Sequence, residues 1–96
     1  MKKLTLLVHS EVGLHARPAA LFVDRANRYE SEILVRNLST HSDWADAKSI
    51  LSVLTLGVEK DHQIELQVSG LDEEPAVAAL AALVDAAFGE GQGSVS

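Results

Sequence analysis

The sequence contains no cysteine, and this absence removes several kinds of chemistry at once. Disulfide bonds, thiolate zinc sites and thiol nucleophiles are all excluded. A chain without cysteine is typical of a reducing compartment, so we expect a cytoplasmic protein. Four histidines are present, but they lack the spacing of metal ligands, and we expect neither a metal ion nor another cofactor; they are His9, His15, His41 and His62.

Long hydrophobic runs and a surplus of positive charge are also missing. No segment approaches the length of a membrane span, so we expect no membrane insertion. The N-terminal apolar run breaks at His9-Ser10-Glu11 with no signal-peptide cleavage site after it, so we interpret this run as a strand. Eight Lys and Arg against fourteen Asp and Glu give a net charge of −6, which argues against a nucleic-acid partner.

The 96 residues, 47% of them hydrophobic, are enough for one domain with a modest core. We place this domain at residues 1–88. Residues 89–96 are rich in glycine and serine, and we expect them to be a disordered tail.

Hydrophobic periodicity predicts seven elements within this domain. Alternating apolar residues predict strands at 2–8, 32–36 and 63–69, and a polar, turn-prone stretch from Asn37 to Ser42 predicts a hairpin to a short strand at 43–46. Helical spacing predicts helices at 16–28, just after Ser49, and from an Asp72 cap to Phe88. In the last helix the expected buried stripe consists of Val77, Leu80, Ala81, Val84 and Phe88.

The order strand, helix, strand, strand, helix, strand, helix defines a fold class. It predicts an α+β domain, a two-layer open-faced sandwich in which the helices cover one face of a four-stranded antiparallel sheet.

The segment Gly13-Leu14-His15-Ala16-Arg17-Pro18 places a histidine where a loop becomes a helix. Pro18 fits there because first-turn N–H groups have no intrahelical partner. The free amides and the positive end of the helix dipole favour an anion at this point and disfavour a charged imidazole ring. His15 is therefore a candidate nucleophile for a phosphoryl group. Taken alone, the same residues are also compatible with an ordinary surface histidine beside an arginine.

A second segment, Lys48 to Val58, predicts a short helix with Ser49 as its N-cap and Gly57 as its C-cap. A helix of this length cannot bury all of its large apolar side chains. We expect part of Ile50, Leu51 and Leu54 to be exposed, and a small apolar patch of this kind is typical of a docking surface.

Together, the block Gly13 to Ala19 and the block Lys48 to Val58 resemble HPr, the small phosphocarrier of the bacterial phosphoenolpyruvate-dependent phosphotransferase system. The resemblance covers residues 2–88 and includes the order of the elements. It implies a carrier and not an enzyme. Such a carrier accepts a phosphoryl group from Enzyme I and passes it to IIA-type acceptors during sugar uptake.

The resemblance also implies roles for individual residues. His15 would carry the phosphoryl group on Nδ1, Arg17 would balance its charge, and Ala16 and Arg17 would offer backbone amides. Ser49 matches a position that a dedicated HPr kinase phosphorylates in some bacteria, although a serine is a good N-cap in any case. The partner-binding residues would be Ala20, Lys48, Ile50, Leu51 and Leu54. We expect a monomer.

Three features depart from the HPr pattern. Val12 replaces a polar side chain that commonly reaches the phosphate, so one hydrogen bond to the phosphoryl group would be missing. The segment 37–46 is about three residues longer than usual and holds His41 and Trp44, which predicts an enlarged hairpin loop. Asp24 lies on the expected docking side, where a cation is common.

Several alternatives stay open. A nitrogen-branch carrier or a carrier domain of a dihydroxyacetone-kinase system would share both blocks. A ferredoxin-like domain that binds a small molecule has a similar order of elements, but it does not explain the two blocks. An acylphosphatase-like enzyme lacks support because no anion-loop arginine follows the first strand.

Overall fold

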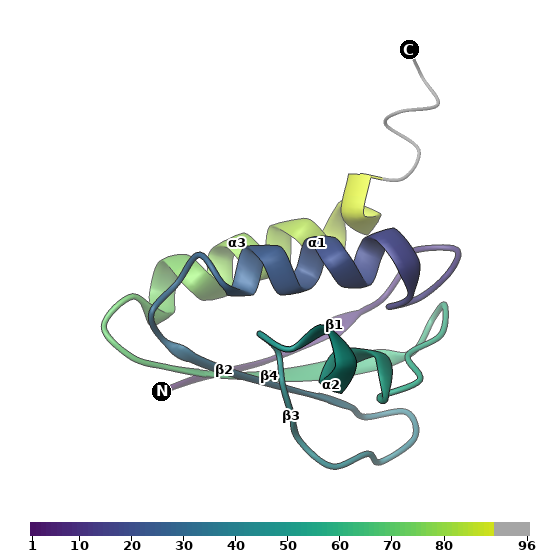
Figure 1. Cartoon of the computed structure of the whole chain (residues 1–96), viewed down its shortest axis with the longest axis horizontal. Helices are drawn as coiled ribbons and strands as arrows, with labels where there is room; N and C mark the ends of the chain where they lie inside the picture. The colour runs from purple at the N-terminus through teal and green to yellow at the C-terminus, as the bar shows by residue number, and fades with distance from the viewer. Residues whose placement is uncertain (90–96) are drawn as a thin grey trace.

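The computed structural model describes residues 1–89 as a sheet covered on one face by helices (Figure 1). The strands are β1 (Lys2–Leu7), β2 (Glu32–Asn37), β3 (Ala45–Asp46) and β4 (Gln63–Ser69). The helices are α1 (Ala16–Ala26), α2 (Ile50–Leu54), α3 (Glu73–Asp85) and a final 3₁₀ turn, η1 (Ala87–Gly89). The predicted tail lies mostly outside the described residues.

The predicted fold class is confirmed. All strand pairs are antiparallel and the order across the sheet is β1-β4-β2-β3, so the last strand in the chain is inserted between β1 and β2. β4 is therefore central and pairs on both sides, with Leu66 opposite Leu4 and Val35. No helix within residues 1–89 is long and apolar enough to cross a membrane.

The core lies between the sheet and the two long helices. Ile64, Leu66 and Val68 point inward from β4 and are fully buried, as their strict alternation predicts. Phe22 from α1 and Leu80 from α3 are fully buried as well. The buried stripe of α3 differs from the predicted one, because it consists of Ala76, Leu80 and Val84, whereas Val77 and Ala81 are only half-buried. The helix also ends earlier than predicted, at Asp85, and the buried Phe88 lies in η1.

The first helix is shorter than predicted, ending at Ala26 and not at residue 28. The Asn27 side chain donates to the Val23 carbonyl at 2.9 Å and to the Lys48 carbonyl at 3.0 Å. The next two amides, of Arg28 and Tyr29, bond to carbonyls three residues back. The Val23 carbonyl thus accepts from both the amide and the side chain of Asn27, and the same side chain links the end of the helix to the segment that precedes α2.

Two other predicted caps are wrong in detail. Asp72 occupies the N-cap position of α3, but its carboxylate makes no cap bond there and instead accepts hydrogen bonds from the 30–31 loop. Helix α2 ends at Leu54 with Thr55 as its C-cap, and Gly57, at φ +60°, follows two residues later. For Asp72 the cause is a loop distant in sequence that binds its carboxylate; at the end of α2 the Leu56 and Gly57 amides bond to carbonyls three residues back.

The long 37–46 segment forms the predicted hairpin loop, but its second strand consists of Ala45 and Asp46 alone. Trp44 comes just before that strand, and the Arg36 guanidinium lies 4.8 Å from the centre of its ring. Arg36 also pairs with Glu65 at 2.6 Å, so the loop is fixed to the sheet by a cation–π contact and an ion pair.

Candidate functional site

The candidate site lies where the loop from β1 to α1 meets the loop from α2 to β4. The Leu14 amide donates to the Val58 carbonyl at 2.9 Å. At the other end of the two loops, the Asp61 amide donates to the Val8 carbonyl at 2.8 Å, and the Val8 amide donates to the His62 carbonyl at 2.9 Å. These backbone bonds join residues 44 to 54 positions apart in sequence and hold the two loops in one fixed arrangement.

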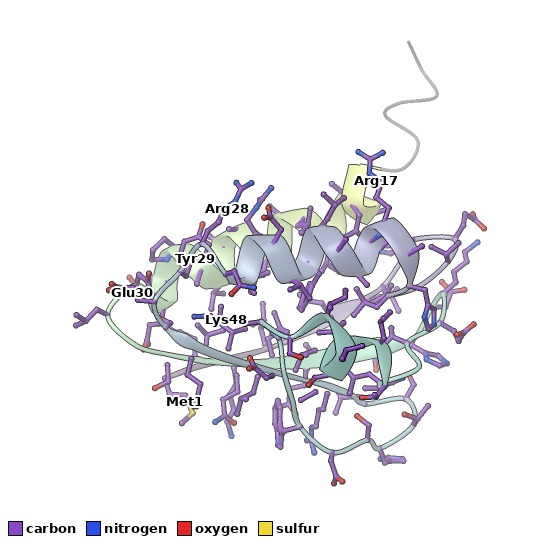
Figure 2. All side chains as sticks on the ribbon, viewed as in Figure 1. Met1, Arg17, Arg28, Tyr29, Glu30 and Lys48 are labelled. Carbon is purple, nitrogen blue, oxygen red and sulfur yellow. The ribbon has the colours of Figure 1, made fainter. Side chains whose placement is uncertain are left out.

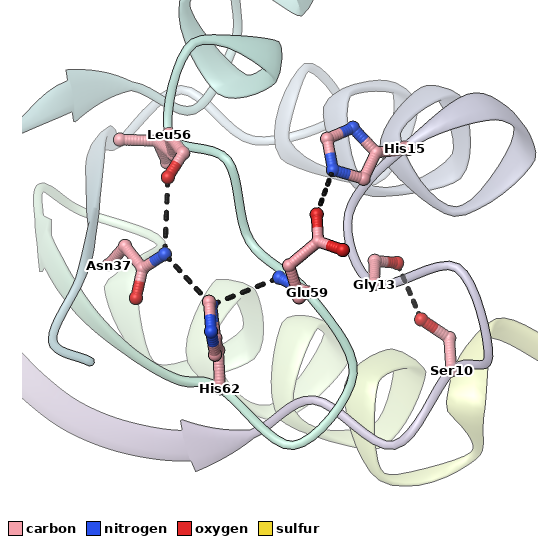
Figure 3. A network of polar contacts seen from close by, with 7 residues as sticks. All are labelled: Ser10, Gly13, His15, Asn37, Leu56, Glu59 and His62. Carbon is pink, nitrogen blue, oxygen red and sulfur yellow. Dashed lines mark hydrogen bonds and ion pairs between the residues drawn. The ribbon is translucent and has the colours of Figure 1, made fainter. Parts of the chain in front are cut away.

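Gly13 is the point of closest approach between the two loops. Its φ is +66°, and a Cβ atom there would lie 2.1 Å from the Val58 carbonyl oxygen. The buried Ser10 hydroxyl donates to the Gly13 carbonyl, which fixes the turn from the other side (Figure 3). Only glycine satisfies both the backbone conformation and the available space.

His15 occupies the predicted N-cap position of α1 in an extended conformation. Its side chain makes no cap bond to the helix, and 37% of it is exposed. The next residue, Ala16, has a φ of +51°, which an alanine rarely adopts. The chain therefore turns sharply into the helix directly after the histidine, and such local strain is typical of functional sites.

The imidazole ring of His15 has one occupied and one open nitrogen. Nε2 lies 3.0 Å from the Glu59 carboxylate, which comes from the facing loop (Figure 3). A carboxylate only accepts hydrogen bonds here, so Nε2 is the protonated nitrogen. Within residues 1–89, Nδ1 has no hydrogen-bond partner, and its lone pair is therefore available.

Donors that could bind an anion lie at the start of α1, directly after His15 in the chain. The Ala16 and Arg17 amides precede the first helical hydrogen bond and have no acceptor in the described part of the chain. Arg17 is exposed, and Figure 2 shows its side chain extending outward beside η1. No ion pair with Arg17 is formed among residues 1–89, so its guanidinium is available for a ligand.

An exposed apolar patch adjoins the histidine, as predicted from the shortness of α2. Leu51 is 75% exposed, and the patch also includes Ile50 and Leu54 on the same helix and Ala20 on α1, which packs against α2. Val12, in the loop before α1, is exposed as well, and its apolar side chain offers no hydrogen bond. The described residues enclose no pocket, and His15 lies on an open surface.

The remaining predicted residues have structural contacts of their own. The Ser49 hydroxyl accepts a hydrogen bond from the Ser52 amide at 3.3 Å, which confirms it as the N-cap of α2. Lys48 is half-buried, and its ammonium donates to the Tyr29 carbonyl at 2.6 Å (Figure 2). Asp24 on α1 forms an exposed ion pair at 3.0 Å with Arg28, which follows the end of that helix.

Glu59 is the site residue that the sequence reasoning missed. It lies 44 residues from His15 in an exposed loop, and no motif joins the two. Behind it, His62 Nδ1 accepts hydrogen bonds from the Glu59 amide at 3.0 Å and from the buried Asn37 side chain at 3.2 Å. The sequence alone does not show how the roles of His15 and His62 differ. The structure does, because the ring of His15 contacts Glu59 through Nε2, whereas Nδ1 of His62 accepts hydrogen bonds from the Glu59 amide and from Asn37.

Comparison with known proteins identifies the family. The family model described as "PTS HPr component phosphorylation site" matches residues 2–86. The chain is 40% identical over 87 residues to a multiphosphoryl transfer protein of Vibrio cholerae, covering 91% of this chain but 22% of that protein. It is 36% identical to the phosphocarrier protein NPr of Klebsiella oxytoca, covering 92% of this chain and 96% of the relative.

A solved structure agrees with these relatives. The HPr-C-His structure from Thermoanaerobacter tengcongensis superposes with a TM-score of 0.88 at 41% identity, covering 94% of this chain and 98% of that one. A second structure from that organism, with a TM-score of 0.73, is of an HPr dimer. The fold and the family match together define the class, a domain of the HPr-type phosphocarriers. The chain belongs to the HPr family of the phosphotransferase system.

Proposed function

We propose that His15 carries a phosphoryl group on Nδ1, accepting it from phospho-Enzyme I and passing it to a IIA-type acceptor. The observation that carries this proposal is the asymmetry of the ring, in which Nε2 is bonded to Glu59 and Nδ1 has no partner in the described part of the chain. In-line transfer needs an accessible nucleophile and donors for the phosphate oxygens. The Ala16 and Arg17 amides supply such donors, and the Arg17 side chain adds a positive charge.

The exposed patch around Leu51 is proposed as the partner-binding surface. Ala20, Ile50 and Leu54 would pack against both donor and acceptor, because the same histidine must face each in turn. Lys48 would contribute less than its charge alone suggests, since its ammonium already binds the Tyr29 carbonyl.

Ser49 is proposed as a regulatory site for an HPr kinase. Its hydroxyl is half-buried and caps α2 beside the patch, so a phosphate there would place about two negative charges at the docking surface. Binding of an acidic partner would weaken.

The pathway that this carrier serves depends on which Enzyme I phosphorylates it and which acceptor receives the phosphoryl group. Sugar uptake is our first proposal, and a nitrogen-branch carrier is the second, favoured by the 36% identity to NPr over nearly the whole length of both chains. A third possible pathway is that of a dihydroxyacetone-kinase system, in which the carrier would also transfer a phosphoryl group from its histidine. We further propose a cytoplasmic monomer.

The test is labelling from phosphoenolpyruvate by Enzyme I with wild type, His15→Ala and His41→Ala. His41 is an exposed histidine in the distant hairpin loop and serves as the matched control. We expect acid-labile label in wild type and His41→Ala and none in His15→Ala. Label that persists at another residue in His15→Ala would contradict the proposal. Parallel reactions with the Enzyme I of the sugar branch and that of the nitrogen branch assign the pathway.

A further inference from the structure

The side chains of His15 and Glu59 are in contact although both are partly exposed to solvent. Glu59 is 65% exposed and could point freely into solvent, yet its Oε2 lies 3.0 Å from His15 Nε2. A carboxylate that accepts a hydrogen bond from one ring nitrogen fixes the tautomer and the orientation of an imidazole. Here it leaves the lone pair on Nδ1.

The backbone of Glu59 is held in place by residues that do not touch His15. The Glu59 amide donates to His62 Nδ1 at 3.0 Å, and Val58, just before it, is fully buried. The Asn37 side chain donates to the same His62 nitrogen and to the Leu56 carbonyl, at 3.2 and 3.1 Å (Figure 3). Asn37 is itself buried, so the turn that presents Glu59 is anchored in the core.

We propose that Glu59 is a positioning residue for phosphoryl transfer, with His62 and Asn37 holding it in place. Its carboxylate directs Nδ1 outward and stabilises the charge that the ring gains on phosphorylation. This inference rests on the proposed carrier function and adds a residue that the HPr-like motifs do not include.

The chemical step explains why a carboxylate is suited to this position. The Nδ1 lone pair forms the bond to phosphorus, while the bond from phosphorus to the donor's nitrogen breaks and its electron pair stays with the donor. The proton on Nε2 remains, so the ring becomes a cation with Glu59 beside it. When the group is passed on, the ring is again a neutral leaving group. An anion at Nε2 thus favours the phosphorylated state, as the buried carboxylate favours imidazolium in serine-protease triads.

Two kinds of measurement test the proposal with the variants Glu59→Gln, Glu59→Ala and the control Asp61→Asn. Asp61 is exposed in the same loop at φ +70°, which asparagine tolerates, and its side chain has no hydrogen bond within residues 1–89. Asp61→Asn therefore removes the same charge from the same loop without removing a contact to the ring.

The first measurement uses the unphosphorylated protein and does not depend on any carrier function. The ¹⁵N shifts of the His15 ring nitrogens, recorded above the titration range of imidazole, report which nitrogen carries the proton. We expect well-separated signals in wild type, Asp61→Asn and Glu59→Gln, because glutamine retains an acceptor oxygen. In Glu59→Ala the signals should move toward those of a free histidine. Unchanged signals in Glu59→Ala would overturn the positioning role.

The second measurement is the rate of phosphoryl transfer from phospho-Enzyme I. Glu59→Gln should lower the maximal rate about fivefold with little change in KM, as expected for the loss of one partly exposed charge interaction, and Glu59→Ala should lower it further. Asp61→Asn should match wild type; an equal loss in Asp61→Asn would show a general field effect and overturn the proposal. If wild type is not phosphorylated at all, the carrier function fails, and the ring signals still decide the positioning role.

Discussion

At the scale of single residues, the site depends on how closely two backbones approach. A Cβ atom added at Gly13 would lie 2.1 Å from the Val58 carbonyl oxygen, whereas one added at Gly57 would have no atom within 4 Å beyond its chain neighbours, although both glycines have a φ near +60°. Alanine substitutions at the two glycines therefore separate the loss of stability caused by a left-handed backbone conformation from the loss caused by a steric clash. His15 follows Gly13 by two residues, so the clash would also displace the imidazole ring of His15.

Gly13→Ala should destabilise the protein by about 2–4 kcal/mol, because backbone strain and overpacking add at this position. Gly57→Ala, with no atom within 4 Å of the added Cβ, should cost only about 1 kcal/mol from its positive φ. Urea denaturation of both variants measures the difference. Equal losses would contradict the steric role of Gly13.

At the scale of elements, α2 is too short to bury its apolar side chains, and this property produces the surface beside His15. Its five residues include three large apolar residues with substantial exposure, Ile50, Leu51 and Leu54. Val53 alone is fully buried and fixes the helix to the core. A helix attached by one buried side chain and a serine cap leaves the rest of its surface for a partner.

Leu51→Ser should leave the unfolding free energy within about 0.5 kcal/mol of wild type, because the side chain is mostly in water already. Transfer to a IIA-type acceptor should slow about tenfold through a higher KM, since an apolar contact to the partner is lost. Leu71→Ser is the matched control, because Leu71 is fully exposed in the loop before α3. If both variants transfer equally well, α2 is not the docking surface.

At the scale of the whole molecule, the carboxylate of Asp72 links the loop between α1 and β2 to the start of α3. Asp72 accepts hydrogen bonds from the Glu30 amide at 2.8 Å, the Ser31 amide at 2.9 Å and the Ser31 hydroxyl. The Ser31 hydroxyl bond, followed by the bond from the Glu30 amide, lowers the pKa of Asp72 in the folded state. The pKa of Glu73 is also lowered, mainly by the Gly70 amide and then by the N-terminus.

These lowered pKa values predict a loss of stability in acid. Because the unfolded chain binds protons more readily, the contribution of Asp72 is complete above about pH 4 and is lost as the pH falls through its folded-state pKa. Asp72→Asn should therefore be less stable than wild type at pH 7 and show a shallower decline between pH 5 and 2. Urea denaturation across this range measures the slope. The exposed Asp85→Asn should keep the wild-type slope, and a wild-type slope in Asp72→Asn would contradict the linkage.

The sequence by itself determined the order of the elements, the fold class and the place of His15 at the start of α1. These follow from local rules: alternation in the strands, helical spacing, and a proline in the first turn of α1, three residues after His15. The exposure of α2 was also predictable, because its length can be compared directly with its apolar content.

Only the tertiary structure decided which polar groups meet. Asp72 was predicted as a cap and binds another loop, Asn27 ends α1 by reaching Lys48, and Glu59 pairs with His15 across 44 residues. No local sequence pattern predicts these contacts, because a polar side chain in a loop can form the same kind of hydrogen bond with several different groups. The packing of two loops around Gly13 selects one of them, and that choice gives His15 one occupied nitrogen and one open nitrogen.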